Sequence, residues 1–200
     1  MGDLTIGDDV NIAASNAIPL EITPIETIST TDMTVVVEAG NNPTISATEP
    51  DWSRENCDKW WEPSRQLLKC IRGYQKWQSN CGILGKCLRA WYIIWHRFWS
   101  VVTGADIPLN CQLAGGLVLP HPNGIVIHPA TSIGPNCMIF QQVTIVGGVE
   151  VSGHVDIGAG AKIIRPVKIG EHATVGANAV VVHDVPAKAT VAGVPAKIIK

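Results

Sequence analysis

The sequence lacks any run of about 18 apolar residues, the length expected of a helix that crosses a bilayer. Residues 1–11 are acidic and have no apolar centre, so they do not resemble a secretory signal peptide. The formal net charge is −2, which gives the whole chain no general attraction to nucleic acid or to an anionic membrane. We therefore expect no membrane span and no nucleic-acid partner.

The sequence also lacks a Cys-x-x-Cys pair, the spacing typical of zinc sites and redox motifs. Its six cysteines are scattered between Cys57 and Cys137. Cys137 falls in a series of inward-facing positions and is predicted to be a buried thiol. Buried, unpaired thiols are typical of a reducing compartment, so we expect a cytoplasmic location.

Lys and Arg are absent from residues 1–50, which hold eight acidic residues. Residues 51–200 hold the other nine acidic residues and all 15 basic ones, a net charge of +6. A basic body suits a phosphate-bearing ligand, although ordinary surface charge explains it equally well. Residues 1–50 are predicted to form a flexible acidic leader, or one or two strands laid on the body.

What the chain does have is a strict period of six. Every sixth residue from Ile127 to Val181 is aliphatic, and a second series of small or aliphatic residues lies four positions after each, from Thr131 to Val185. This period fits neither an α-helix nor an ordinary strand. It does fit coils of about 18 residues, in which short parallel strands stack their aliphatic side chains inside a prism. We therefore predict a mainly β fold, a parallel β-helix over residues 104–200.

All seven tryptophans lie in residues 51–103, which are predicted to be a small α-helical segment. A first helix is expected from about Pro63, a favoured first-turn residue, to Trp77, with a break at residues 80–82. A second helix is expected from an apolar stripe at helical spacing. Its members are Leu84, Cys87, Leu88, Trp91, Trp95, Phe98, Trp99 and Val102. We expect this stripe to pack over the open end of the β-helix, although an aromatic stripe can also bind a ligand.

The repeat is broken once, between Leu119 and Ile127, where two extra residues have entered. The segment that holds them is Pro-His-Pro-Asn-Gly, residues 120–124. Breaks of this kind push side chains out of the wall of a solenoid, and His121 lies inside the break. His121 is the candidate general base, because imidazole titrates near neutral pH, although a surface histidine in a turn is an equally ordinary explanation. Asp106, which precedes His121 by close to one coil, is a candidate partner on a neighbouring rung.

The other histidines suggest less chemistry. His154 and His172 are one coil apart and are expected to stack on one outer face. No third histidine is well placed beside them, so no metal site is predicted. His128 and His183 are expected at corners or on the surface.

Several motifs carry a family resemblance over about 95 residues, from Asp106 to the end. They are Ala-Asp-Ile at 105–107, Leu-Pro-His-Pro-Asn-Gly-Ile-Val-Ile at 119–127, Phe-Gln-Gln-Val-Thr-Ile at 140–145, Ile-Gly-Ala-Gly-Ala-Lys-Ile at 157–163 and Ala-Gly-Val-Pro-Ala-Lys-Ile at 192–198. This region resembles the hexapeptide-repeat acyltransferases and, among them, serine O-acetyltransferase. The resemblance implies a left-handed β-helix, a homotrimer, and acetyl-CoA bound as co-substrate in a groove between subunits. It implies His121 as general base and Asp106 as the residue that orients its ring.

The resemblance also implies cofactor contacts near Gly147, Ala159 and Ala177, largely through the backbone, and a phosphate contact at Lys197. Repeat geometry alone also explains small residues at such corners. Two departures concern the acceptor. The family has Asp immediately before its catalytic histidine, where this chain has Pro120. It also has a loop with an Arg-His pair after the stretch that corresponds to residues 143–148, and that loop is absent from this sequence.

The resemblance implies an acetyl-CoA-dependent O-acetyltransferase, with L-serine as the first-choice acceptor and cysteine biosynthesis as its setting. A sugar hydroxyl in polysaccharide synthesis is the alternative acceptor. A non-catalytic β-helix scaffold is the third hypothesis. The presence of both Asp106 and His121 disfavours it, because a purely structural wall requires neither.

Overall fold

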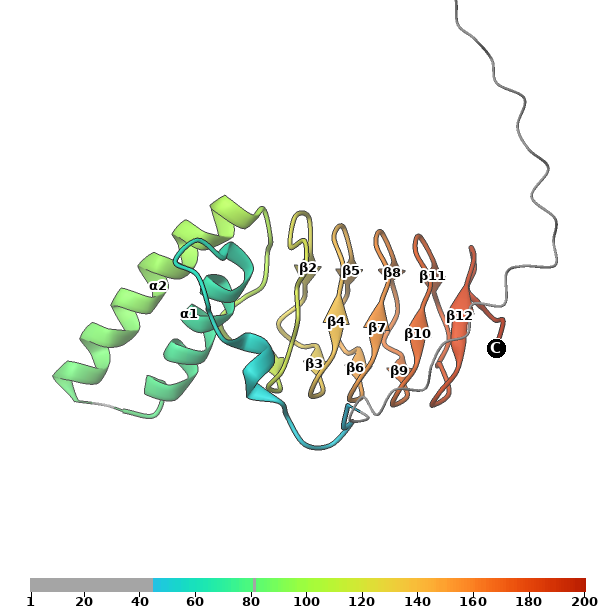
Figure 1. The fold of residues 1–200 in the computed structure, drawn as a ribbon, viewed down its shortest axis with the longest axis horizontal. Coiled ribbons are helices and arrows are strands. Elements are labelled where there is room, and N and C mark those ends of the chain that lie inside the picture. The colour runs from blue at the N-terminus through green and yellow to red at the C-terminus, as the bar shows by residue number, and fades with distance from the viewer. Residues whose placement is uncertain (1–44, 81) are drawn as a thin grey trace, which may run out of the picture. The chain divides into compact units, whose positions relative to one another are not determined.

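The computed structural model describes residues 45–80 and 82–200. These residues lie in the unit Pro43–Lys200, and the other unit, Met1–Asn42, falls outside them together with most of the expected acidic leader. The described chain begins with a short 3-10 helix η1 (Trp52–Glu55), followed by the helices α1 (Pro63–Trp77) and α2 (Ile83–Thr103) and then by strands only (Figure 1). The predicted bounds of the first helix and the predicted break after it are confirmed.

Short strands fill the rest of the chain. They are β1 (Gln112–Leu113), β2 (Val126–Ile127), β3 (Ser132–Ile133), β4 (Met138–Ile139), β5 (Thr144–Ile145), β6 (Glu150–Val151), β7 (Asp156–Ile157), β8 (Lys162–Ile163), β9 (Lys168–Ile169), β10 (Thr174–Val175), β11 (Val180–Val181), β12 (Thr190–Ala192) and β13 (Lys197–Ile198). Only the last pair, β12 and β13, is antiparallel among the described strands.

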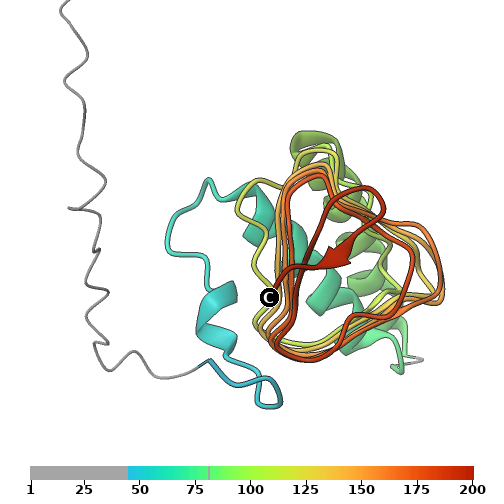
Figure 2. The same ribbon diagram turned by 90° about the vertical axis from the view of Figure 1, so that its right-hand side faces the viewer.

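The strands form three parallel sheets, in the orders β1-β3-β6-β9, β2-β5-β8-β11 and β4-β7-β10-β12. From β2 to β11 each strand pairs with the third strand along the chain, as the three faces of a prism require, whereas at the two ends β1 pairs with β3 and β10 with β12. Viewed along its axis, the unit shows a triangular outline of superimposed coils (Figure 2). The predicted fold class is confirmed, a left-handed parallel β-helix preceded by a small helical segment.

The two inward series form the core. Within the regular run every member from Ile127 to Val181 is at most 5% exposed, and the side chains stack in columns because paired residues lie about 4.8 Å apart. Cys137 is fully buried, as predicted, and its Sγ donates to the carbonyl of Ser152 at 3.1 Å. Burial raises the pKa of this thiol to about 11.

The first and last coils depart from the regular length. Asp106 is bridged to Val126 and Leu113 is paired with Ile133, so the first coil is longer than the others, which confirms the predicted two-residue insertion. At the other end Ile169 is bridged to Val185, so the last coil is shorter than the others. Val185 therefore lies in the first inward series and not, as predicted, in the second. Two residues are missing from the corner before it, and the strict period of six ends there.

The corner between the sheet β1-β3-β6-β9 and the sheet β4-β7-β10-β12 places residues in the left-handed region of backbone space. The residues at this corner are Gly116, Asn136, His154, His172 and Lys188, with φ between +53° and +78°. Asn136 also holds the first described residues against the corner. Its Nδ2 donates to the carbonyls of Ser46 and Glu49, and its Oδ1 accepts from the Asp51 N–H at 2.8 Å.

The helix α1 closes the open end of the first coil. Leu67, Leu68 and Ile71 are buried with the core of the β-helix. Polar contacts fix the same interface, because the Arg72 guanidinium donates to the carbonyl of Ala114 at 2.6 Å and forms a 2.8 Å ion pair with Glu55. α1 thus supplies the cap that a solenoid end needs to cover its exposed core.

The prediction that the aromatic stripe of α2 forms this cap is wrong for most of its members. Only Trp99 is buried, whereas Leu84, Trp91 and Phe98 are 66%, 56% and 46% exposed. α2 instead turns the opposite face inward, with Gly85, His96, Trp99 and Thr103 buried. That face contains small and polar residues, so a count of apolar positions selected the wrong side of the helix.

No helix among the described residues is both long and apolar enough to cross a membrane.

Candidate active site

The predicted base lies in the loop that the two-residue insertion creates. Leu119 and Ile125 are buried on either side of it, and the His121 side chain is exposed between them. Backbone hydrogen bonds fix this loop. The Gly124 N–H donates to Gly104 O at 2.9 Å and the Ile125 N–H to Pro122 O at 3.2 Å. His121 is therefore held outside the wall by a defined turn.

Asp106 lies on the first coil, one rung from the strand that follows this loop. Its N–H donates to Ile125 O at 2.8 Å, and its carbonyl accepts from the Ile127 N–H at 3.0 Å. The side chains of Asp106 and His121 are both exposed, and no hydrogen bond joins them within residues 45–80 and 82–200. Burial raises the pKa of the neighbouring Cys111 to about 11, and the carboxylate of Asp106 adds to that effect. The dyad therefore stays a prediction from the sequence.

Three of the four predicted cofactor residues line up along one edge of the prism. Ala159 and Ala177 occupy the corner that His121 occupies on the first coil, because Gln142 N–H donates to Asn123 O and Asn178 N–H to Ala159 O. Three rung spacings of about 4.8 Å place the corner of Ala177 about 14 Å from the histidine loop.

Lys197 continues this edge. Its strand pairs it with Ala192, which packs against Gly176 immediately before Ala177. Gly147 lies elsewhere, at the next corner of its coil, where an added Cβ would lie 2.7 Å from Nδ1 of His128. The structure therefore brings Ala159, Ala177 and Lys197 onto one line with His121 and places Gly147 off that line.

Two further residues on this edge were missed from the sequence. Oε1 of Gln141 is a buried atom without a hydrogen-bond partner among the described residues, and Gln141 precedes Gln142 on the rung between His121 and Ala159. The Lys162 amine contacts the carbonyl of Gln142 and the hydroxyl of Thr144. A buried acceptor left unpaired costs about 1–3 kcal/mol, which makes Gln141 a candidate ligand contact. The six-residue repeat could not identify Gln141 as a site residue, because Gln141 falls at a corner position that any polar residue can occupy.

A small cavity of about 230 Å³ adjoins the histidine loop. It lies between the segment before α1 and the first coil, and its lining includes Arg54, Glu62, Arg65 and Pro120, the residue before His121. Arg65 forms 3.3 Å ion pairs with Glu62 and Asp58. Arg54 donates to the carbonyl of Asn136 and has no ion pair within the described part of the chain. The cavity thus offers both signs of charge beside the candidate base, which sequence spacing gave no means of predicting.

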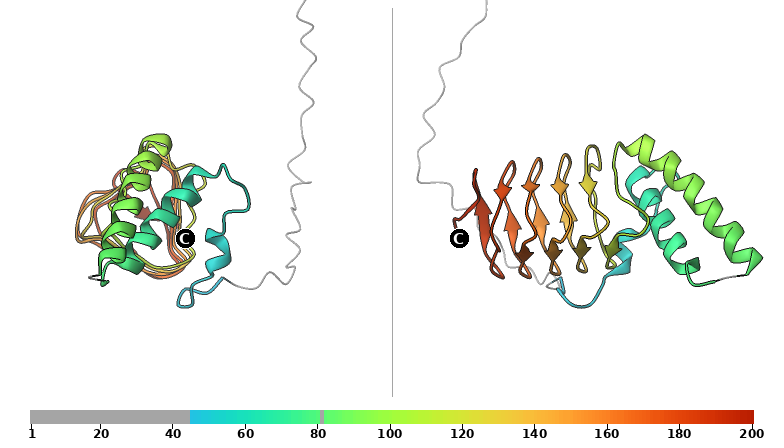
Figure 3. Two further views of the ribbon diagram at one scale, coloured as in Figure 1. Left: turned by 90° about the vertical axis from the view of Figure 1, so that its left-hand side faces the viewer. Right: turned by 180° about the vertical axis from the view of Figure 1, so that it is seen from behind.

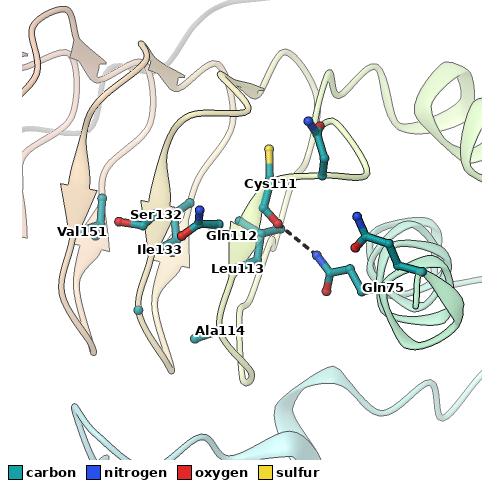
Figure 4. Close-up of a pocket in the computed structure, with 11 residues that line it drawn as sticks. Gln75, Cys111, Gln112, Leu113, Ala114, Ser132, Ile133 and Val151 are labelled. Atoms are coloured by element: carbon teal, nitrogen blue, oxygen red, sulfur yellow. Dashed lines mark hydrogen bonds between the residues drawn. The ribbon is translucent and has the colours of Figure 1, made fainter. Parts of the chain in front are cut away.

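A second hollow, of about 540 Å³, lies between α1 and the sheet β1-β3-β6 (Figure 4). Backbone and uncharged side chains line it, and Gln75 Nε2 donates to Cys111 O across its edge at 3.0 Å. None of the predicted site residues contributes to it.

Three other histidines make contacts within the fold. Burial lowers the pKa of His96, although its hydrogen bond to Ile107 O at 2.9 Å acts in the opposite direction. His154 and His172 stack as predicted, with their Nδ1 atoms 2.7 Å apart. Among the described residues no group of three or more His, Cys, Asp or Glu is placed to hold a metal ion.

Comparison with known proteins gives a consistent result. A serine acetyltransferase of Synechococcus elongatus is 36% identical over 146 residues, which cover 68% of this chain and 57% of the relative. A serine acetyltransferase of Mycobacterium tuberculosis is 35% identical over 131 residues, which cover 62% and 54%. This chain therefore spans little more than half the length of the curated relatives it matches. No family model matches the chain.

Solved structures agree with the curated relatives. Soybean serine acetyltransferase complexed with serine superposes with a TM-score of 0.59 at 30% identity, covering 70% of this chain and 58% of that one. A serine acetyltransferase in complex with CoA gives 0.59 at 31% identity, covering 70% and 57%. The chain is therefore similar to the serine acetyltransferases both in sequence and in its hexapeptide-repeat fold.

Proposed function

We propose that this chain is an acetyl-CoA-dependent O-acetyltransferase that converts L-serine to O-acetylserine, the step that supplies cysteine biosynthesis. The observation that carries the proposal is the loop of His121 beside a cavity lined by Arg54, Glu62 and Arg65. The similarity to serine acetyltransferases supports the same reaction. A cytoplasmic location belongs to the proposal and is supported by free thiols at Cys70, Cys111 and Cys137.

In this reaction His121 is the general base. Its imidazole takes the proton of the serine hydroxyl while the oxygen attacks the thioester carbonyl carbon. The tetrahedral intermediate then expels the CoA thiolate, which receives a proton from the imidazolium. Asp106 is the residue that orients the imidazole and stabilises its protonated form.

The edge from His121 to Lys197 suits an extended acyl-CoA. Ala159 and Ala177 leave the corner open to a ligand, and the exposed Lys197 ammonium at its far end provides a partner for phosphate. Oε1 of Gln141 is buried and unpaired among the described residues, and after an outward turn of the side chain it would accept a hydrogen bond from an amide N–H of the pantetheine arm. Gly147 lies off this line, so its contact would have to come from a ligand or a subunit that reaches the next corner.

The cavity beside the loop fits a zwitterionic acceptor. An α-carboxylate is bound by guanidinium groups such as those of Arg54 and Arg65, and an ammonium group by the carboxylate of Glu62. This arrangement takes the place of the family's Arg-His loop. The corner where that loop would start is occupied in this chain by Gly147 and Gly148, which connect β5 directly to β6.

A homotrimer is part of the proposal. Val146, Ile164 and Val182 stack along one corner of the prism, and Ile164 is 49% exposed although it is aliphatic. A second subunit packed on this stripe would bury it. The open edge between His121 and Lys197 would then face a neighbouring chain.

A sugar hydroxyl is the alternative acceptor. The observation that favours it is the short β5–β6 corner, which offers no side chain for an amino acid. A sugar would need hydrogen-bond donors and acceptors in place of the paired charges around the cavity.

Thiol release from acetyl-CoA by the purified chain separates these acceptors, with L-serine and a panel of sugars offered one at a time. We expect release with serine, and a loss of about 100-fold or more in kcat in His121→Ala. Arg54→Gln should raise KM for serine with a smaller effect on kcat, and the exposed Arg165→Gln should change neither. Thiol release with sugars alone would show that the acceptor is a sugar hydroxyl and not serine. No thiol release with any acceptor would contradict the proposal that the chain is an enzyme.

A further inference from the structure

The outward face of α2 is apolar. Nine large hydrophobic residues of this helix are exposed, from Ile83 at 82% to Trp95 at 37%. The set is Ile83, Leu84, Trp91, Ile93, Ile94, Trp95, Phe98, Val101 and Val102. At 100° per residue all of them except Ile93 fall within an arc of about 120°, opposite the buried residues Gly85, His96 and Thr103. A contiguous patch that contains so many exposed large hydrophobic residues marks an interaction surface.

Aromatic rings extend this face onto the segment before α1. Ring contacts with centroids 5.1–5.7 Å apart run without a break through Trp60, Trp61, Trp99, Phe98, Trp95 and Trp91. We call these six residues the aromatic array. They line a groove of about 380 Å³, to which Lys69 and Gln66 also contribute. Trp60 is 80% exposed and Trp99 is 6% exposed, so the array runs from the core to a surface that is open to solvent.

All of the charged side chains in α1 and α2 are basic. Residues 63–105 contain seven Lys or Arg residues and no Asp or Glu. Lys86 and Arg97 fall beside the apolar arc, about 40–60° from its edge. Neither the net charge of −2 for the whole chain nor the net charge of +6 for residues 51–200 reveals that this segment has basic residues and no acidic ones.

We propose that α2 and the aromatic array dock on the surface of an anionic lipid bilayer. An exposed helix with an apolar face and a cationic border is the physical form of an interfacial helix. Tryptophan favours the boundary between headgroups and acyl chains, where an apolar ring and a polar N–H are both satisfied. The helix does not span the membrane, in keeping with the finding for the described helices.

The charge argues against a second copy of the chain as the occupant. Two such faces packed together would bring Lys86 and Arg97 of one copy near those of the other, with no acidic residue from residues 63–105 to neutralise them. Anionic headgroups supply the missing counter-charge. The position of α2 also suits a flat surface, because it is the outermost element at the end of the unit opposite the C-terminus (Figure 3). The prism then projects away from the bilayer.

Co-sedimentation of the full chain with sucrose-loaded vesicles tests the proposal. One set contains phosphatidylcholine alone and the other phosphatidylcholine with phosphatidylglycerol. We expect binding to the anionic vesicles that weakens with added salt. Lys86→Gln combined with Arg97→Gln should weaken it roughly 25-fold, at about fivefold for each charge. Lys168→Gln combined with Lys188→Gln removes the same charge from the prism and should change it little.

A second variant tests the contribution of the apolar face to vesicle binding. Ile94→Ser combined with Val101→Ser removes two outward side chains and should reduce binding tenfold or more. Ile198→Ser combined with Ile199→Ser, which are 60% and 67% exposed at the opposite end, is the matched control. Circular dichroism checks that each variant is folded. Failure of the wild-type chain to pellet with anionic vesicles would overturn the proposal. So would a sedimentation-velocity experiment in which Ile94→Ser with Val101→Ser dissociates a larger assembly, since the face would then bind a second copy.

Discussion

Leu67→Ala is expected to destabilise the chain far more than Leu84→Ala, although the two substitutions remove the same atoms from helices of the same segment. Leu67 is fully buried in α1 against the first coil, and Leu84 is 66% exposed on α2. A buried leucine replaced by alanine typically loses about 2–5 kcal/mol, because both the transfer free energy and the packing around the cavity are lost. We expect a loss in this range for Leu67→Ala.

The expectation for Leu84→Ala is much smaller. About a third of its side chain is covered, so the loss of apolar burial is below about 1 kcal/mol. Alanine also has the higher helix propensity, which offsets part of that loss. The net change in the free energy of unfolding should lie near zero.

Urea denaturation followed by far-ultraviolet circular dichroism measures both variants, with equal slopes required for the comparison. A loss for Leu84→Ala that equals or exceeds that of Leu67→Ala would refute the assignment of α1, and not the aromatic stripe, as the cap of the β-helix. It would also show that the outward face of α2 is covered in the folded protein.

Three further results are expected. Burial lowers the pKa of His96, so the unfolded chain takes up a proton more readily at that residue, and stability should fall as the pH drops below the ordinary histidine pKa of about 6.5; His96→Gln should lessen this dependence in denaturant titrations at several pH values, and an unchanged slope would contradict the assignment. Gln141→Leu removes an unpaired buried acceptor and should leave the free energy of unfolding equal or about 1 kcal/mol higher while raising KM for acetyl-CoA; a stability loss with unaltered KM would assign Gln141 a structural role. With its pKa raised to about 11, Cys137 should be alkylated by iodoacetamide far more slowly than the exposed Cys87 in peptide mapping, and equal rates would contradict its burial.

The sequence was sufficient for the β-helix because the fold repeats one constraint in every hexad. An aliphatic residue at each sixth position fits neither an α-helix nor an ordinary strand. The break before Ile127 marked the insertion that the longer first coil confirms. The corresponding loss of two residues near Val185 was missed. Valine suits either inward column, so the side-chain type could not reveal the change of register.

The helices show where pattern reasoning failed. An apolar stripe predicts that a face will be buried, but it does not say against which surface. In α2 the buried residues are Trp99 and the small or polar residues Gly85, His96 and Thr103, and most of the apolar stripe points outward. For the site, spacing predicted the loop of His121. It could not predict Arg54 and Arg65 beside that loop, because those contacts join segments that are far apart in the sequence.

The most direct test of the proposed serine acetylation is to identify the product that the purified chain forms from acetyl-CoA and L-serine. Mass spectrometry of the reaction mixture should show O-acetylserine accumulating with wild-type protein and nearly absent with an equal amount of folded His121→Ala. Wild-type protein that binds acetyl-CoA but forms no O-acetylserine, or a His121→Ala variant that forms it at the wild-type rate, would contradict the account.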